Sequence, residues 1–292
     1  MIGSGGFSLI YLAEDEDTRE RVVIKEYLPK KMAARRKVAK IEVAGGEKQQ
    51  NTFHHGRKLF YQEAKALAGL QHPNVVKVRN FFLANGTSYL VMDYEPGKNL
   101  GRYIKQRRGS LSATFLMNVF PPILDALSLI HSSRHLHLDI KPSNIHLRPG
   151  GSPLLLDFGA VHDVSRVSQS KSGRVVTPGF SPVEQYYASG HIGPWSDVYA
   201  IGASMRACIE GKSPPSAIKR HAKDNMSVAA SSFAGRYPAY LLQAMDWAME
   251  MDPRRRPQTA GDMLRVLMEQ IEQPVAATTK TNATEQWRAE DS

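Results

Sequence analysis

The sequence predicts an α+β fold in which a small β-rich half precedes a larger helical half. Aliphatic stretches with strand-like alternation concentrate before residue 95, and long segments with helical spacing follow Pro96-Gly97. The totals agree with a globular chain, because 42% of the 292 residues are hydrophobic and 23% are charged.

Two hairpins account for the β-rich half. The alternating stretch from Ser8 to Tyr27 predicts the first hairpin, with "TRER" at its turn. The second is "VRNFFLANGTSYLVMDY", in which Asn85 and Gly86 are the residue types that tolerate positive φ in a type I′ turn. We therefore expect an antiparallel sheet.

A helix separates the two hairpins. The stretch "RKLFYQEAKALAGL", residues 57–70, has apolar side chains at helical spacing, and "HPN" ends it. The preceding segment, about 30–58, contains "KKMAARRKVAK", "GGEKQQN" and "HHGRK" and is interpreted as a mobile basic insertion.

The second half is predicted to be mainly helical. The expected helices span about 99–107, 112–134, 196–210, 238–250 and 259–272. We expect one domain half over 1–95 and the other over 96–273. The polar residues 274–292 lack apolar periodicity and predict a disordered tail.

Charge and cysteine content restrict the function. The formal charge of +10 favours anionic partners, yet no basic–aromatic repeat or zinc-finger spacing supports nucleic acid as a partner. Cys208, the single cysteine, excludes an internal disulfide framework and is expected to be a small core residue. No segment approaches the roughly 20 apolar residues of a membrane span, so a cytoplasmic location is the default expectation.

Two short motifs precede residue 70. The glycine-rich stretch "GSGGFS" is followed by a strand, as a loop that folds over phosphates requires, although glycines also mark ordinary tight turns. Lys25 in "VVIKEY" lies on a strand among aliphatic neighbours, where a lysine needs a partner. Glu63 on the predicted helix is the natural partner, and the alternative is an unrelated surface pair.

Two further motifs bring polar groups to loops. In "HLHLDIKPSN", Asp139, Lys141 and Asn144 lie within six positions around Pro142, which favours a fixed loop. In "LLLDFGA", an apolar strand ends at Asp157, where a carboxylate requires a cation or a donor. The oxygens of Asn144 and Asp157 suit Mg²⁺ bound largely through phosphates and water.

The order and spacing of these motifs resemble the eukaryotic-like (Hanks-type) serine/threonine protein kinases, in wording their bacterial branch. The resemblance runs from Gly3 to about Ile271. It implies a bilobal protein-kinase-like fold, with a small β-rich N-lobe whose first strand is truncated and a larger α-helical C-lobe. It also implies ATP and Mg²⁺ as cofactors, with Mn²⁺ as an alternative, and protein substrates with Ser or Thr acceptors.

The resemblance assigns roles residue by residue. The implied catalytic residues are Asp139, Lys141, Lys25, Glu63 and Thr177. The implied nucleotide-binding residues are Gly3, Gly5, Gly6, Val23, Lys25, Met92, Asp93, Glu95 and His146. The implied metal ligands are Asn144 and Asp157. Structural roles are implied for Glu184 paired with Arg256, and for Asp197 anchoring the catalytic loop.

The sequence departs from the family pattern at several places. Ser8 replaces the third loop glycine, and His146 stands where a leucine commonly packs beneath adenine. Leu138 replaces the arginine of H-R-D, which in the family meets a phosphate on the activation segment. We therefore expect that phosphorylation of that segment is not the switch that turns activity on. The alternative functions are a pseudokinase scaffold and a kinase for small molecules.

Overall fold

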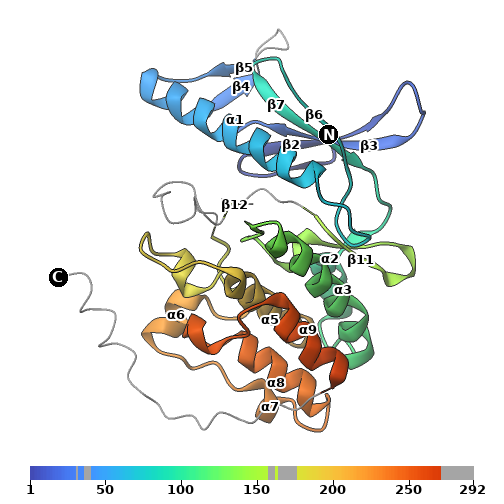
Figure 1. Ribbon diagram of the computed structural model, residues 1–292, viewed down its shortest axis with the longest axis vertical. Coiled ribbons are helices and arrows are strands. Elements are labelled where there is room, and N and C mark those ends of the chain that lie inside the picture. The colour runs from blue at the N-terminus through green and yellow to red at the C-terminus, as the bar shows by residue number, and fades with distance from the viewer. Residues whose placement is uncertain (31, 36–40, 157–161, 164–175, 271–292) are drawn as a thin grey trace, which may run out of the picture.

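The computed structural model describes residues 1–30, 32–35, 41–156, 162–163 and 176–270, and it has two lobes (Figure 1). A sheet and a long helix make the upper lobe, and helices dominate the lower one. The predicted α+β order, a β-rich half before a helical half, is confirmed. The predicted tail, 274–292, lies outside the described residues.

The N-lobe contains an antiparallel five-stranded sheet. Its strands lie in the order β1 (Gly3–Ser4), β2 (Ser8–Glu14), β3 (Arg21–Tyr27), β7 (Thr87–Asp93) and β6 (Val78–Ala84). Asn85 and Gly86 have φ of 51° and 80°, as the predicted second hairpin requires. The first hairpin turns earlier than predicted, because the Asp15 carboxylate accepts the N–H groups of Asp17 and Thr18.

The helix α1 (Glu47–Ala68) begins ten residues before the predicted helix. The expected mobile basic insertion is therefore wrong for residues 47–58, which are helical, and a short hairpin of β4 (Ala33–Arg35) and β5 (Ile41–Val43) precedes them. The Phe53 ring, buried at 1% exposure, lies 5.3 Å from the ring of Tyr27. This aromatic contact fixes the added turns of the helix to the sheet.

The C-lobe is built mainly from helices. They are α2 (Leu100–Arg107), α3 (Ala113–Ser132), α5 (Pro194–Glu210), α6 (Ala217–Ala222), α7 (Ala229–Ser232), α8 (Ala239–Ala248) and α9 (Ala260–Glu269). Short strands β8 (Lys98–Asn99), β9 (His135–Leu136), β10 (Ile145–Leu147), β11 (Pro153–Leu155) and β12 (His162–Asp163) face the N-lobe side. Four 3₁₀ turns complete the described elements: Pro142–Asn144, Pro149–Gly151, Val183–Gln185 and Pro253–Arg255.

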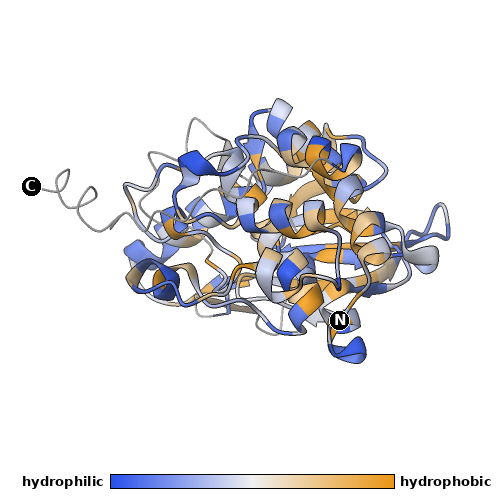
Figure 2. Cartoon of the chain, turned by 90° about the horizontal axis from the view of Figure 1, so that it is seen from below, coloured by the Kyte–Doolittle hydropathy of each residue, from blue (hydrophilic) through white to orange (hydrophobic). Residues whose placement is uncertain are grey.

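The five helices predicted for this half are all present, and α6 and α7 are additional. Helix α3 is the longest of the C-lobe and lies in its core, where Leu116, Phe120 and Leu124 are fully buried. In Figure 2 the hydrophobic residues gather along the middle of the molecule and the hydrophilic ones along its outer loops. Burial of this apolar face is the main force that holds the lobe together.

Helix α3 also changes one expectation from the sequence. It has 20 residues and contains an 18-residue stretch with a mean hydropathy of 1.5, so it is long and apolar enough to cross a membrane by length and composition. Half of that stretch is buried inside the C-lobe, as expected for the core helix of a globular domain. The expectation that no segment approaches the required length is therefore wrong, and the composition reflects the lobe's own core.

Candidate active site

The loop between β9 and β10 brings the predicted polar groups together. The Asp139 carboxylate accepts hydrogen bonds from Lys141 Nζ at 2.8 Å (Oδ1) and 2.7 Å (Oδ2). Thr177 Oγ1 donates to Oδ1 at 2.7 Å, and Asn144 Nδ2 donates to Oδ2 at 3.1 Å. Three side chains from two separate segments thus converge on one carboxylate.

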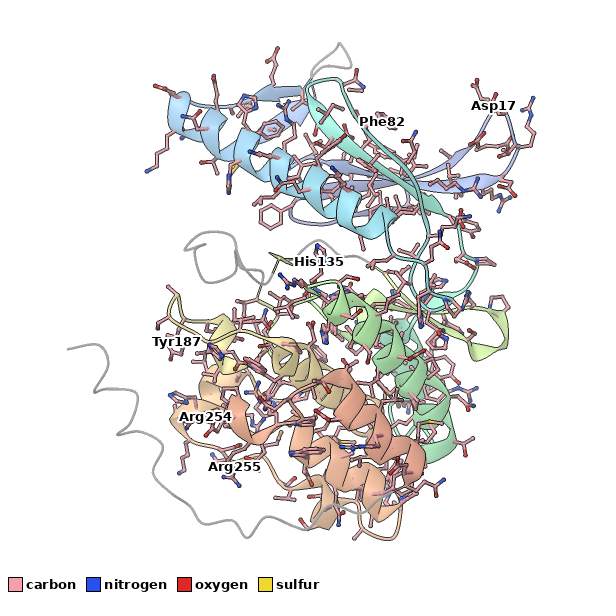
Figure 3. The ribbon with its side chains drawn as sticks, viewed as in Figure 1. Asp17, Phe82, His135, Tyr187, Arg254 and Arg255 are labelled. Atoms are coloured by element: carbon pink, nitrogen blue, oxygen red, sulfur yellow. The ribbon has the colours of Figure 1, made fainter. Side chains whose placement is uncertain are left out.

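This loop lies between the lobes. Figure 3 places His135, at its start, on the side of the C-lobe that faces the N-lobe. Pro142 opens the 3₁₀ turn Pro142–Asn144, and Asn144 Nδ2 also donates to the carbonyl of Asp139 at 2.8 Å. Asp139 and Asn144 are therefore held at a fixed separation by the backbone as well as by their side chains.

Asp197 of α5 anchors the loop from below, as the resemblance implies. Its carboxylate is fully buried and accepts the N–H groups of His137 at 2.9 Å and Leu138 at 2.7 Å. Leu138 has φ of 56°, a left-handed conformation that costs a leucine about 1–2 kcal/mol, so these bonds hold a strained residue in place.

A histidine completes the Asp197 site. His131 Nε2 lies 2.9 Å from Asp197 Oδ2. Burial raises the pKa of Asp197, but the hydrogen bond and charge of His131 and the contacts with His137 lower it more, and the resulting pKa lies below the ordinary value of 3.8. The carboxylate therefore stays ionised as it holds the loop.

Thr177 is positioned by its own turn. Its N–H donates to Ser181 Oγ at 2.9 Å, and its carbonyl accepts the N–H of Ser181 at 2.9 Å. Further along, the predicted pair of Glu184 and Arg256 is confirmed, with Nη1 and Oε1 2.7 Å apart and both side chains buried. The segment that carries Thr177 is thus attached to the C-lobe core.

Leu138 occupies an apolar environment. It packs in a cluster with Leu136 and Ile192, and only 4% of it is exposed. Its carbonyl accepts a hydrogen bond from Gln185 Nε2 at 2.9 Å. Sequence reasoning missed Gln185, because a glutamine next to Glu184 carries no signal of a contact 47 positions away.

On the N-lobe side, Lys25 lies on β3 with Ile10 and Leu90 as its cross-strand neighbours. It is 5% exposed, and its Nζ lies 5.5 Å from the centre of the Phe60 ring of α1. This contact brings α1 against the lysine. The side chain of Glu63, one turn further along α1, and all of Asp157 lie outside the described residues, so the predicted roles of both stay predictions.

The glycine-rich stretch forms the turn between β1 and β2. Gly3 pairs with Ile10, and the Gly5 N–H donates to the Ser8 carbonyl at 2.8 Å. A Cβ added at Gly6 would meet nothing within 4 Å, and its φ is not in the left-handed region. Neither packing nor backbone conformation within the described residues therefore requires glycine there, and the predicted phosphate contact of Gly6 stays a prediction.

The connection between the lobes contains the predicted adenine contacts. Met92 is the cross-strand neighbour of Val23, and the Asp93 N–H is engaged by the Lys77 carbonyl at 3.0 Å. Glu95 follows two residues later, with its carboxylate 3.8 Å from Arg148.

His146 supports the end of this connection. Its Nε2 lies 3.2 Å from the Pro96 carbonyl. Gly97 has φ of 140°, and a Cβ there would lie 2.7 Å from His146 Nε2 and 2.1 Å from the Leu147 carbonyl oxygen, so no other residue fits. His146 thus contacts the inter-lobe connection, beside the expected adenine site.

The residues present fit a nucleotide and a divalent cation. Because Nδ2 of Asn144 binds Asp139, its Oδ1 is the atom left for a cation, with Ser143 Oγ 3.5 Å away. Among the described residues no group of three His, Cys, Asp or Glu side chains could hold a metal by itself. A cation here would therefore depend on ligand phosphates and on Asp157, as Mg²⁺ in phosphoryl-transfer sites does.

The chain belongs to the protein kinase family: the protein kinase domain matches residues 1–269. Its relatives are bacterial serine/threonine kinases, which confirms the resemblance drawn from the motifs. It is 29% identical to the serine/threonine-protein kinase PknA of a Nostoc species, over 91% of this chain and 45% of that protein. It is 26% identical to PrkC of Bacillus subtilis, over 90% of this chain and 38% of that protein.

Solved structures agree with the fold. The chain superimposes on the structure described as "PpkA-294 apo form" with a TM-score of 0.80 and 33% identity, covering 91% of this chain and 93% of that one. The chain spans half or less of the length of the first curated relatives that it matches. Membership of the family implies ATP, a divalent metal and protein substrates.

Proposed function

We propose that this chain is an ATP-dependent serine/threonine protein kinase domain. It transfers the γ-phosphoryl group of Mg-ATP to Ser or Thr hydroxyls of protein substrates, and to its own. The observation that carries the proposal is the Asp139 carboxylate, which Lys141, Thr177 and Asn144 hold between the lobes. This arrangement provides a proton acceptor, a positive charge and an oxygen ligand within one loop and its neighbouring turn.

In this proposal Asp139 accepts the proton of the attacking hydroxyl as that hydroxyl approaches the phosphoryl group. Thr177 Oγ1 and Lys141 Nζ fix the orientation of the carboxylate. Lys141 also places a positive charge where negative charge develops during transfer. Lys25, supported by Glu63, holds the α- and β-phosphates from the opposite lobe.

ATP supplies the phosphoryl group when it is bound, and the divalent cation neutralises its charge. We assign the cation to Asn144 Oδ1 and Asp157, whose hard oxygens suit Mg²⁺, with Mn²⁺ as the alternative. Further nucleotide contacts are assigned to the backbone of Gly3, Gly5 and Gly6, the side chains of Val23, Met92 and His146, the Asp93 carbonyl and the Glu95 backbone. The space beside Gly6 is open, because a Cβ added there would meet no atom of the described chain within 4 Å, and this openness is compatible with the glycine contacts.

The proposed kinase function comes with three further proposals, on the acceptor residue, the class of substrate and the cellular location. Lys141 together with Thr177 favours serine and threonine over tyrosine, because the depth of the platform in front of Asp139 selects the acceptor. The segment that carries Thr177 suits peptide substrates better than small molecules. The single cysteine and the use of ATP favour a cytoplasmic location.

A pseudokinase scaffold is the rival function, and nothing in the relatives favours it. Its usual mark is loss of the strand lysine, the loop aspartate or the metal aspartate. Lys25 and Asp139 are present in the described site, and Asp157 is present in the sequence.

The test is incubation of the chain with labelled ATP, Mg²⁺ and a protein substrate, followed by phosphoamino-acid analysis and mass-spectrometric mapping. We expect phosphoserine and phosphothreonine, and loss of Mg²⁺-dependent transfer in Asp157→Ala with an unchanged circular dichroism spectrum. No transfer by the wild type would favour the pseudokinase. A product dominated by phosphotyrosine would refute the acceptor assignment, and full activity of Asp157→Ala would refute the metal assignment.

A further inference from the structure

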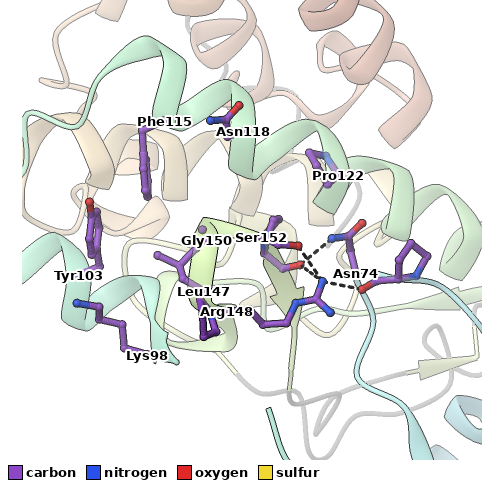
Figure 4. Close-up of a pocket in the computed structure, with 14 residues that line it drawn as sticks. Asn74, Lys98, Tyr103, Phe115, Asn118, Pro122, Leu147, Arg148, Gly150 and Ser152 are labelled. Carbon is purple, nitrogen blue, oxygen red and sulfur yellow. Dashed lines mark hydrogen bonds between the residues drawn. The ribbon is translucent and has the colours of Figure 1, made fainter. Parts of the chain in front are cut away.

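A recess of about 800 Å³ lies on the C-lobe, between α2, the N-terminal half of α3 and the β10–β11 turn (Figure 4). Tyr103 and Phe115 stand at one end of it, and Arg148, Ser152 and Asn74 at the other. None of the proposed catalytic, metal-binding or nucleotide-binding residues lines it. The recess is therefore separate from the candidate active site.

The apolar end of the recess is a rigid aromatic pair. The rings of Tyr103 and Phe115 stack with their centres 5.1 Å apart and their planes at 11°. Both are only partly buried and pack against the core of the C-lobe. A bulky apolar side chain of a ligand would bury its surface here, and rigid aromatic rings lose little entropy when they bind.

Lys98 and Arg148 are the two cations that line the recess, and Arg107 lies beside its Tyr103 ring. Lys98 Nζ lies 5.3 Å and the Arg107 guanidinium 5.5 Å from the centre of the Tyr103 ring, and both side chains are exposed. Between Pro96 and Leu124 the sequence contains no aspartate or glutamate, and its cations are Lys98, Arg102, Lys105, Arg107 and Arg108. The cations of this stretch therefore give the α2 side of the recess a positive charge, which attracts an anionic ligand.

Arg148 lies at the end of the recess opposite the aromatic pair, where hydrogen bonds hold its guanidinium in place. Its Nη2 donates to the Pro73 carbonyl and to Ser152 Oγ, each at 2.9 Å. Its nearest carboxylate is that of Glu95, 3.8 Å away. Its Nε is buried and has no hydrogen-bond partner among the described residues, an unmet donor that native proteins seldom leave.

We propose that this recess is a docking site for an extended acidic segment of a protein substrate. An apolar side chain of the segment packs against Tyr103 and Phe115, and carboxylates on either side of it meet Lys98, Arg107 and Arg148. The proposal rests on the proposed kinase function, since a tethered substrate presents its acceptor at a raised effective concentration. Docking of this kind lowers KM and leaves the chemical step unchanged.

The geometry favours an acidic peptide over other anions. A membrane surface would need large apolar side chains on the rim, and none of the large hydrophobic residues found exposed in the described part of the chain lines the recess. Single-stranded nucleic acid is bound by successive bases that stack on several aromatic rings, whereas the residues that line the recess include only the one stacked pair of Tyr103 and Phe115.

The test is fluorescence anisotropy with a labelled peptide of Glu and Asp residues around a central Leu, without Ser, Thr or Tyr. We expect the wild type to bind it, with affinity that falls as salt is raised. The double variant Lys98→Glu/Arg107→Glu should bind about tenfold more weakly, which is about 1.4 kcal/mol. Since the probe has no acceptor and no ATP is present, the result does not depend on phosphoryl transfer.

The matched control is Lys219→Glu/Lys223→Glu, which reverses two exposed cations at α6, on the other side of the C-lobe from α2 (Figure 1). It should bind as the wild type does. Equal affinity of all three proteins, or no peptide binding by the wild type, overturns the proposal. So does binding of phosphatidylserine vesicles or an oligothymidine strand in place of the peptide, with the same dependence on Lys98 and Arg107.

A kinetic measurement then separates docking from the kinase function. An acceptor peptide fused to the acidic segment is compared with the same peptide fused to a neutral segment. We expect KM to be about tenfold lower with the acidic segment in the wild type, with this advantage lost in Lys98→Glu/Arg107→Glu and kcat unchanged. A change in kcat alone would contradict a docking role.

Discussion

The two halves of the candidate site are built in different ways. On the C-lobe side, Asp139 is held by hydrogen bonds from Lys141, Asn144 and Thr177 of the chain itself, and buried Asp197 supports the loop beneath it. On the N-lobe side, the glycine turn has one hydrogen bond within it among the backbone contacts described, and its neighbour Phe7 is 60% exposed.

The same contrast holds for the lobes as a whole. Of the ten large hydrophobic residues found exposed in the described chain, seven lie before residue 84 and three in the C-lobe. The C-lobe half of the candidate site is therefore the more extensively fixed of the two, and we expect a bound nucleotide to add contacts to the N-lobe half. Substitutions in the C-lobe half should change kcat or stability, and those in the glycine turn should change nucleotide affinity.

The largest expected effect is that of Asp139→Asn. Removal of the proton acceptor should lower kcat by about 10²- to 10⁴-fold with little change in KM for ATP. Initial rates on a protein substrate measure it, and Asp17→Asn, at the exposed tip of the β2–β3 hairpin in Figure 3, is the control. A variant that keeps wild-type kcat would remove Asp139 from the reaction.

Next in size is the buried ion pair behind Thr177. Arg256→Met leaves Glu184 buried and unpaired, so the free energy of unfolding should fall by about 3–5 kcal/mol. Denaturant unfolding measures this, and the double variant Glu184→Gln/Arg256→Met should lose less than the single one. Arg254→Met is the control, because its ion pair is exposed and worth about 1 kcal/mol or less. A double variant less stable than the single one would contradict this reading.

Acidification should expose the role of Asp197. Its pKa is lower in the folded chain than the ordinary 3.8, so its stabilising contribution is complete above that pH and is lost as the pH falls through the folded value. The difference in unfolding free energy between wild type and Asp197→Asn should therefore shrink as the pH falls below 3.8. A difference that does not change as the pH falls from about 5 to about 3 would contradict this role of the carboxylate.

The elements that sequence patterns predicted are those with local causes. Asn85-Gly86 sets its own turn, and the long periodic helices α3 and α5 carry their apolar faces in the sequence. Helix α7, with four residues, is too short for periodicity to appear. The first turns of α1 were missed because Phe53, which anchors them, stands among polar residues and packs on a strand 26 positions earlier.

The contacts of the candidate site also fall into local ones, which the sequence predicted, and long-range ones, which it did not. Asp139, Lys141 and Asn144 lie on one loop, so their motif was visible in the sequence. The hydrogen bonds from His131 to Asp197 and from Gln185 to Leu138 span 66 and 47 positions in the sequence. Local sequence patterns cannot predict contacts at such separations. They arise only when α3, α5 and the Thr177 segment pack together.

A substitution in the glycine turn tests whether the N-lobe half of the candidate site contacts the nucleotide. Gly6→Ala adds a methyl group where no atom of the described chain lies within 4 Å, so thermal stability should not change. The methyl group would instead meet the nucleotide and raise KM for ATP about fivefold, on the order of 1 kcal/mol. Gly46→Ala, also in open space but distant from the motif, should leave KM as it is. An unchanged KM in Gly6→Ala would place the phosphates elsewhere.

The smallest expected effect concerns the segment from His162 to Arg174. Most of it, including its serines, lies outside the described residues. The serines are Ser165, Ser168, Ser170 and Ser172, and the cations near them in sequence are Arg166, Lys171 and Arg174. Phosphates on these serines could be met by those cations without reaching the catalytic loop.

Leu138 is the reason to expect little from phosphorylation there. In the family an arginine at its position pairs with an activation-segment phosphate, whereas Leu138 is 4% exposed in a cluster with Leu136 and Ile192 and offers no side-chain donor. Replacing all four serines with alanine should therefore keep the initial rate on an exogenous substrate within about threefold of wild type. A hundredfold drop, about 2.7 kcal/mol of transition-state stabilisation, would show that a phosphate does order the segment. Another basic residue would then have to perform the missing arginine's role, and the C-lobe half of the site would be less complete before phosphorylation than its contacts indicate.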